Sequence, residues 1–149
     1  MIIKKDKACA IYLELSLDLF SLNTVIDNAR SHWAVSANAK KRSMTLIWDK
    51  AKDQVNQELR GRYAVETIWL VGSKARDLDN LLLKSAFDVL VKNKALKNDN
   101  LNNIININHN FVTVASENQG VLIEFYEAEQ DKQKIVEFRQ YLDRLRGVK

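Results

Sequence analysis

The sequence predicts a single α+β domain in which helices flank a small, central mixed sheet. Segments with the two-residue period of strands alternate with segments of helical period. A chain of 149 residues is long enough to bury one hydrophobic core, and its 46% apolar and 28% charged residues are typical of a globular protein. Neither a repeat nor an interdomain linker stands out, so residues 1–149 are expected to form one domain.

The first part of the chain is predicted to form a strand and then two helices. In residues 8–20 leucine and isoleucine alternate with polar side chains, which favours a strand. A short helix is expected over residues 21–34. A longer helix is expected from residue 36 or 38 to residue 60, because apolar residues recur there every three or four positions, and Gly61 would end it.

The middle of the chain is predicted to contain two buried strands joined by a short helical segment. Residues 65–71 are rich in residues that favour strands, and residues 87–91 are apolar on both sides of Asp88. Residues 75–83 between them are expected to form a helical turn or short helix. Residues 99–108 are weakly helical at best.

The last part of the chain is predicted to form a hairpin and a closing helix. Strands are expected over residues 111–116 and 121–126, with residues 118–120 as the turn and Gly120 available for a positive φ. Residues 129–148 have the pattern of an amphipathic helix, with Ile135 and three later apolar residues facing inward.

Charge and cysteine content bound the function classes. The net charge of +4 and the pI of about 9.2 favour polyanionic partners or ligands that carry phosphate. A single cysteine, Cys9, excludes an internal disulfide framework and fits a reducing compartment. No apolar run approaches the ~18 residues of a membrane span, and the N-terminus does not have the pattern of a signal peptide. We therefore expect a cytoplasmic protein without a membrane partner.

A Gly-Ser turn after the strand at residues 65–71 is the first candidate for a functional site. Glycine directly after a strand lets a ligand approach the backbone, and the Ser73 hydroxyl with the following amides can bind phosphate at a helix start. Lys74 and Arg76 would supply positive charge. Gly72, Ser73, Lys74 and Arg76 are therefore the predicted nucleotide-binding residues.

Two lone acids inside apolar segments are the second candidate. Asp88 and Glu124 each lie among apolar residues, where an unpaired carboxylate costs several kcal/mol unless a cation or hydrogen bonds satisfy it. If their strands are neighbours, both carboxylates could bind one Mg²⁺, which takes oxygen ligands and keeps waters for substrate phosphates. Asp88 and Glu124 are accordingly the predicted metal-binding and catalytic residues.

Together these segments resemble the small stand-alone nucleotidyltransferases of the DNA-polymerase-beta superfamily. That family has a strand that ends in Gly-Ser, then about a dozen residues, then a strand with two acids separated by one apolar residue, and a third acid on a later strand. Residues 70–76 and 85–91 match the first two parts, and Glu124 matches the third. The resemblance covers about residues 40–127. It departs from the pattern at Ala86, where the first acid belongs.

The resemblance implies transfer of a nucleoside monophosphate from an NTP to a hydroxyl of RNA or of a partner protein, with Mg²⁺ as cofactor. It also implies a role in a toxin–antitoxin pair or in phage defence. Loss of one bridging acid at Ala86 would weaken metal binding and the rate. An inactivated variant, a protein that binds nucleotide without turnover, and a coincidental match all fit this alanine, so enzymatic activity is left open.

Two further interpretations remain open at this point. A nuclease of the restriction-endonuclease-like class would also use Asp88 and Glu124, but it expects a lysine where Tyr126 stands. A non-catalytic protein that binds nucleotides or nucleic acid would keep Ala86 as its natural residue. The acids of Asp77-Leu78-Asp79 are interpreted as a solvated pair on a helix, where residues two apart diverge. The sequence does not indicate an oligomeric state.

Overall fold

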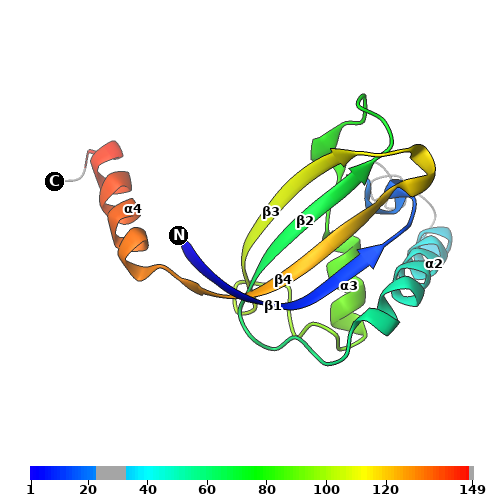
Figure 1. Ribbon diagram of the computed structural model, residues 1–149, viewed down its shortest axis with the longest axis horizontal. Helices are drawn as coiled ribbons and strands as arrows, with labels where there is room; N and C mark the ends of the chain where they lie inside the picture. The colour runs from blue at the N-terminus through cyan, green and yellow to red at the C-terminus, as the bar shows by residue number, and fades with distance from the viewer. Residues whose placement is uncertain (23–32, 148–149) are drawn as a thin grey trace.

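The computed structural model describes residues 1–22 and 33–147, and it confirms an α+β fold with one mixed sheet (Figure 1). The described strands are β1 (Ile2–Leu13), β2 (Tyr63–Val71), β3 (Ile104–Thr113) and β4 (Gly120–Gln130). The described α-helices are α2 (Trp33–Ala51), α3 (Lys84–Lys92) and α4 (Lys132–Leu145). Single 3₁₀ turns lie at Leu17–Phe20, Lys52–Gln54, Leu78–Asn80 and Ser116–Asn118.

The four strands are ordered β1-β4-β2-β3 across the sheet. β4 is antiparallel to both β1 and β2, whereas β2 and β3 are parallel and are connected through α3. The hairpin predicted from residues 111–126 is therefore wrong, because β2 lies between β3 and β4. The parallel pair places the carboxyl ends of β2 and β3 at the same edge of the sheet, which is where ligands commonly bind in sheets with parallel strands.

One face of the sheet carries the hydrophobic core, because α2 and α3 cover it (Figure 1). Along β2, Val65, Thr67 and Trp69 are almost fully buried on that face, while Glu66 and Ile68 point to the other face and are half-buried. None of the described helices covers that second face, which we call the open face.

The helix α2 ends earlier than the predicted helix, at Ala51 instead of residue 60. The side chain of Gln54 explains this end. Its Nε2 donates to the carbonyl oxygens of Lys50 (2.7 Å) and Tyr12 (2.8 Å), and its Oε1 accepts from the amide of Tyr12 (2.7 Å). One glutamine thus satisfies a carbonyl of the last helical turn and ties the chain to β1. The short helix predicted over residues 21–34 lies mostly outside the described residues.

The strand predicted over residues 87–91 is wrong, since these residues form most of α3. Ala86, Phe87, Val89 and Leu90 are buried, and their spacing of one, three and four positions is that of a helix that packs on a sheet. The apolar run was too short for its period to separate the two structures. Residues 75–83, by contrast, contain turns, the 3₁₀ segment at Leu78–Asn80 and a single bridge from Leu81 to Ser21, which agrees with the helical turn that was one of the two predicted alternatives.

β3 includes residues 104–108, which were predicted to be weakly helical, and residues 111–113, which were predicted to be strand. Its asparagines disfavour strands by propensity, but the neighbouring strand satisfies two of them. Nδ2 of Asn108 donates to Oε1 of Glu66 at 3.0 Å, and Nδ2 of Asn110 donates a long bond of 3.5 Å to the carbonyl of Thr67. Tertiary contacts therefore override the local preference.

The C-terminal helix forms as predicted, within narrower bounds, but its apolar side does not face a core. Asp131 caps it, because its Oδ1 accepts from the amide of Lys134 at 3.2 Å. No residue of α4 is buried, and the helix stands clear of the sheet and of the other helices (Figure 1).

β1 begins six residues before the predicted strand at residue 8, because its first residues pair with the end of β4.

Candidate functional site

Asp88 lies on α3, not on a strand, and is half-buried at the surface of that helix. Nζ of Lys84, one turn earlier, donates to Oδ2 of Asp88 at 3.1 Å. The pair spans four positions on the helix, a spacing that stabilises helices modestly. Ala86, the position that the family pattern assigns to an acid, is 1% exposed in the core. An acid there would point into the hydrophobic interior and not toward a substrate.

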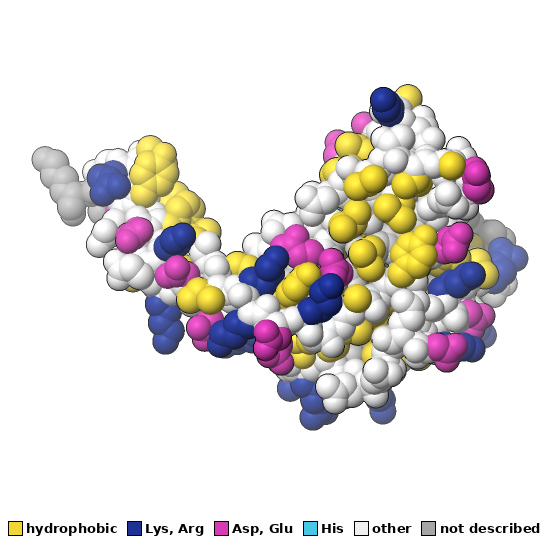
Figure 2. Space-filling model, in the orientation of Figure 1, with side chains coloured by type: hydrophobic (Ala, Val, Ile, Leu, Met, Phe, Trp, Pro, Cys, Tyr) yellow, Lys and Arg dark blue, Asp and Glu magenta, His cyan; other side chains and the backbone are white. Residues whose placement is uncertain are grey.

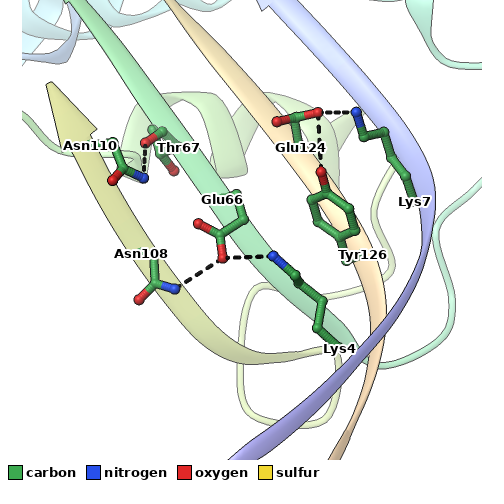
Figure 3. A network of polar contacts seen from close by, with 8 residues as sticks. All are labelled: Lys4, Lys7, Glu66, Thr67, Asn108, Asn110, Glu124 and Tyr126. Atoms are coloured by element: carbon green, nitrogen blue, oxygen red, sulfur yellow. Dashed lines mark hydrogen bonds and ion pairs between the residues drawn. The ribbon is translucent and has the colours of Figure 1, made fainter. Parts of the chain in front are cut away.

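Glu124 lies on β4 and points to the open face of the sheet (Figure 3). It forms an ion pair with Lys7 and accepts a 3.4 Å hydrogen bond from the hydroxyl of Tyr126. The hydrogen bond to Glu124 raises the pKa of Lys7 above its ordinary value. The carboxylate is therefore already satisfied by groups of the protein.

Asp88 and Glu124 are on opposite sides of the sheet. Phe125, the neighbour of Glu124, packs against Phe87 of α3 with 6.4 Å between the ring centroids, so Glu124 itself points away from α3. The metal site predicted between the two carboxylates does not form. A nuclease of the restriction-endonuclease-like class would need both acids at one site, so this geometry also disfavours that interpretation of Asp88 and Glu124.

A second polar group lies next to Glu124 on the open face. Oε1 of Glu66 accepts from Nζ of Lys4 at 3.4 Å and from Nδ2 of Asn108 at 3.0 Å (Figure 3). Lys4 also lies over the ring of Tyr126, 4.5 Å from its centroid. These contacts link β1, β4, β2 and β3 across the open face. We interpret them as a structural network, since each acid in it has a lysine partner.

Gly72 and Ser73 follow β2 as predicted, but they form a tight turn without a helix start. A Cβ atom on Gly72 would lie 3.0 Å from Cα of Ser116, so the glycine is needed for close packing against the loop before β4. Oγ of Ser73 accepts from the amide of Ala75 at 3.2 Å. The amides after Ser73 therefore serve the turn itself, and α3 begins only at Lys84.

A small hollow lies beside this turn, at the carboxyl ends of the parallel strands β2 and β3. Its volume is about 160 Å³, and it is lined by Val71, Ser73, Lys74, Leu78, Phe111, Val112 and Thr113. Pockets that enclose a drug-sized ligand measure roughly 300–1,000 Å³. The hollow can therefore hold a phosphate-sized group beside Ser73 and Lys74, but it does not enclose a nucleoside triphosphate.

The two acids of Asp77-Leu78-Asp79 lie on the exposed loop between this hollow and α3. Asp77 has an extended backbone (φ −73°, ψ 107°) and Asp79 lies in a single 3₁₀ turn, so the predicted helix is absent. Nδ2 of Asn80 donates a long 3.5 Å bond to Asp77. Neither acid forms an ion pair among the described residues, and the neighbouring Arg76 instead pairs with Asp18 at 3.2 Å.

The helical layer under the sheet, which the chain enters at α3 after this loop, has more exposed cations than acids. The exposed basic residues of α2, of α3 and of the turn after α3 are Lys40, Lys41, Arg42, Lys50, Lys84, Lys92, Lys94 and Lys97. Across the same segments there are three acids, Asp49, Asp88 and Asp99. A surface with this excess of positive charge attracts a polyanion such as nucleic acid.

The sequence interpretation set the acids at 77 and 79 aside as a solvated pair. Two acids separated by one apolar residue were visible, with Arg76 before them and Lys84 after them. That interpretation assumed a helix, on which the two carboxylates would diverge, whereas the structure places them on a loop. Within residues 1–22 and 33–147, no three His, Cys, Asp or Glu side chains lie close enough to hold a metal ion by themselves.

Comparison with known proteins gives no family for this chain, so the function has to be inferred from the geometry. No known protein-family model matches the sequence, and no curated protein matches it significantly. In the part of the chain that the structure describes, no helix has the length and apolar character needed to cross a membrane.

Proposed function

We propose that this protein binds nucleic acid on its helical layer and hydrolyses a phosphodiester bond with Mg²⁺ held by Asp77 and Asp79. One observation carries the proposal: within the described structure two exposed carboxylates without an ion-pair partner lie on a loop that leads into α3, part of a helical layer in which exposed cations outnumber acids. Acids in such surroundings reduce the attraction for a polyanion unless a cation offsets their charge.

The donor set of this loop fits Mg²⁺. The ion is commonly bound by one or two carboxylates, several waters and the phosphates of a substrate, so a complete cage of protein ligands is not required. When bound, Mg²⁺ would activate a water and offset the charge that develops on the phosphate. The amide of Asn80 orients the carboxylate of Asp77, and the exposed ammonium groups of Lys74 and Lys84 lie before and after the loop in sequence, where they can contact the backbone of the substrate.

A polymeric substrate fits this geometry better than a free nucleotide. The hollow beside Ser73 and Lys74 is about 160 Å³, below the roughly 300 Å³ at which pockets begin to enclose a small ligand. The acids themselves lie on an open surface. A strand of nucleic acid can cross such a surface and place one phosphate at the loop, since most of its affinity comes from contacts along its backbone.

Nucleotidyl transfer from an NTP to RNA or to a partner protein is the second candidate. It is favoured by Ser73 and Lys74, which line the hollow at the carboxyl ends of the parallel strands. It is disfavoured by the separation of Asp88 from Glu124. In this version Asp77 and Asp79 would replace them as ligands of Mg²⁺.

The experiment is a cleavage assay on single-stranded, duplex and branched DNA and RNA, with Mg²⁺, with Mn²⁺ and with a chelator. We expect metal-dependent cleavage by the protein. Asp77→Asn and Asp79→Asn should each lower the rate about 100-fold or more, which corresponds to the several kcal/mol that a metal contributes to a transition state. Asp53→Asn, an exposed acid in the Lys52–Gln54 turn, is the matched control and should keep the rate.

The assay separates the alternatives. Binding measured in the presence of chelator should persist in the aspartate variants if the helical layer holds the nucleic acid. Absence of cleavage on every substrate, or full activity of both variants, would reject the hydrolytic function. Parallel reactions with α-labelled NTPs and a cell lysate test the second candidate, because transfer would label an acceptor without cleaving nucleic acid.

A further inference from the structure

The open face of the sheet and the helix α4 are both apolar surfaces that the described chain does not cover. On the sheet, an apolar patch spans the strands and consists of Tyr12, Ile68, Leu70, Val112 and Leu122. Figure 2 shows hydrophobic side chains gathered over this part of the face, with charged side chains toward the end of the sheet where β1 begins and β4 ends. Sheets that bury one face usually expose polar residues on the other, so the patch indicates a contact surface.

The helix α4 carries the complementary stripe. Its apolar stripe comprises Ile135, Phe138, Tyr141, Leu142 and Leu145, which lie on one side at helical spacing. Phe138, Tyr141 and Leu145 are 43%, 49% and 64% exposed. An isolated helix of 14 residues is marginal in water, and packing of its apolar side usually supplies the missing stability. The stripe therefore requires a surface to pack on.

The connection between β4 and α4 directs the helix away from its own sheet. β2 begins opposite Glu127, so the last three residues of β4 extend about 10 Å beyond the start of β2, where they pair with β1 and only Ala128 keeps a bond on the other side, to the carbonyl of Arg62. The amide of Asp131 donates to the carbonyl of Met1 at 2.8 Å, and its side chain caps α4. Both bonds fix the single residue that links β4 to α4, and the helix points outward (Figure 1).

We propose that two copies of this chain form a two-fold dimer in which each α4 packs on the open face of the partner's sheet. The same patch and the same helix then serve both copies, as a closed two-fold contact requires. The paired ends of β1 and β4, which we call the arm, place α4 about 10 Å beyond the start of β2 in each copy. The helix therefore lies within reach of a second molecule.

The buried area requires the exchange to be reciprocal. A helix of 14 residues is about 21 Å long and about 10 Å wide, so its footprint is roughly 200 Å². One docked helix buries about twice that area over both surfaces, far below the ~1,200 Å² of a stable interface. Two exchanged helices double the buried area, and the residues of both arms add to it. A single docked helix would dissociate, whereas the reciprocal arrangement approaches the required size.

Light scattering and sedimentation of the full chain over a range of micromolar concentrations test the proposal. We expect a dimer. Phe138→Glu should give monomers, whereas Gln140→Glu on the polar side of the same helix should keep the dimer. On the sheet, Val112→Glu should also give monomers. Its matched control is Ile107→Glu, since Ile107 is similarly exposed on β3 but faces the other side.

A disulfide experiment identifies the contact directly and does not depend on the charge variants folding. In a Cys9→Ala background, the double variant Ile68→Cys with Leu142→Cys should form a disulfide between two chains on mild oxidation. A disulfide within one chain would show that α4 folds back on its own sheet and would overturn the exchange. A monomeric protein at every concentration, or a dimer that neither Phe138→Glu nor Val112→Glu dissociates, would also overturn it.

Discussion

Trp69 and His109 lie on neighbouring parallel strands, and the indole Nε1 of Trp69 donates a 3.0 Å hydrogen bond to Nδ1 of His109. The two rings are stacked, with 6.3 Å between centroids and an angle of 18° between planes. Trp69 is fully buried, so the bond satisfies an N–H group that would otherwise lose water without compensation. Because Nδ1 accepts this bond, the imidazole has to be neutral.

Protonation of His109 should therefore destabilise the fold. Burial lowers the pKa of His109 below its ordinary value of 6.5, so the unfolded chain binds the proton more tightly than the folded chain. The His109 contribution to stability is present above about pH 6.5 and is lost as the pH falls below that value. Thermal unfolding between pH 8 and pH 5 should show a decline in Tm that His109→Gln reduces. Parallel curves for the two proteins would contradict the prediction.

Ala86→Asp should unfold the protein and should not activate it. Ala86 is 1% exposed on the buried side of α3, among the apolar residues that pack on the sheet. A carboxylate there has no cation, and burial of an unpaired charge costs several kcal/mol. Ser85→Asp is the control, because the half-buried Ser85 lies in the first turn of the helix, where a negative charge is favourable. Urea unfolding should show a large loss for Ala86→Asp and little change for Ser85→Asp.

The mistaken assignment of residues 87–91, next to Ala86, to a strand is one of several differences between the predicted and the observed fold, and these differences have a common cause. β2 was found because its residues favour strands, and α4 because its apolar residues recur with a long, regular helical period. Residues 87–91 of α3 were interpreted as a strand because an apolar run of five residues fits either period, and the second part of the family resemblance rested on that strand. The part of the edge strand β3 before residue 111 was missed because Asn108 depends on Glu66, a partner that lies 42 residues away in the sequence. Strand pairing of this kind is set by tertiary contacts that local patterns do not contain.

In the candidate site too, features set by neighbouring residues could be predicted, whereas features set by residues far apart in the sequence could not. Gly72 and Ser73 were located correctly as the turn after β2, since glycine and serine mark such turns locally. The pairing of Asp88 with Glu124 required the strand order, which the sequence did not contain. The acids at 77 and 79 were recognised as a pair but were placed on a helix. Their loop takes its course from contacts with residues 18–21, about 60 positions earlier.

Asn103 should be among the polar residues most sensitive to substitution. Its side chain is almost fully buried, and its Nδ2 donates to the carbonyl oxygens of Arg60 (2.9 Å) and Gly61 (2.8 Å). Loss of the donor leaves those carbonyls without a partner, so Asn103→Ala should cost about 1–3 kcal/mol. Asn103→Asp should cost more, because it directs a carboxylate at two acceptors. Denaturant unfolding measures both, and the exposed neighbour Asn102→Ala should change stability by less than about 0.5 kcal/mol.

Gly120→Ala should destabilise the fold for a steric reason. The sequence suggested that Gly120 would supply a positive φ, but its φ lies outside that region and the need is for space. A Cβ atom there would overlap the carbonyl oxygen of Leu13 and lie 3.2 Å from Cα of Glu14, so β1 would have to move. Crowding of this kind usually costs about 1–3 kcal/mol.

A matched glycine separates this overlap from the general effect of replacing glycine. A Cβ atom on Gly61 would meet the hydroxyl of Tyr63 at 3.2 Å, and that side chain can shift without moving a strand. Gly61→Ala should therefore cost less in the same unfolding experiment. If Gly120→Ala proved as stable as Gly61→Ala, the end of β1 would have to be able to separate from the start of β4, and hydrogen exchange of the Leu13 region would then show weak protection.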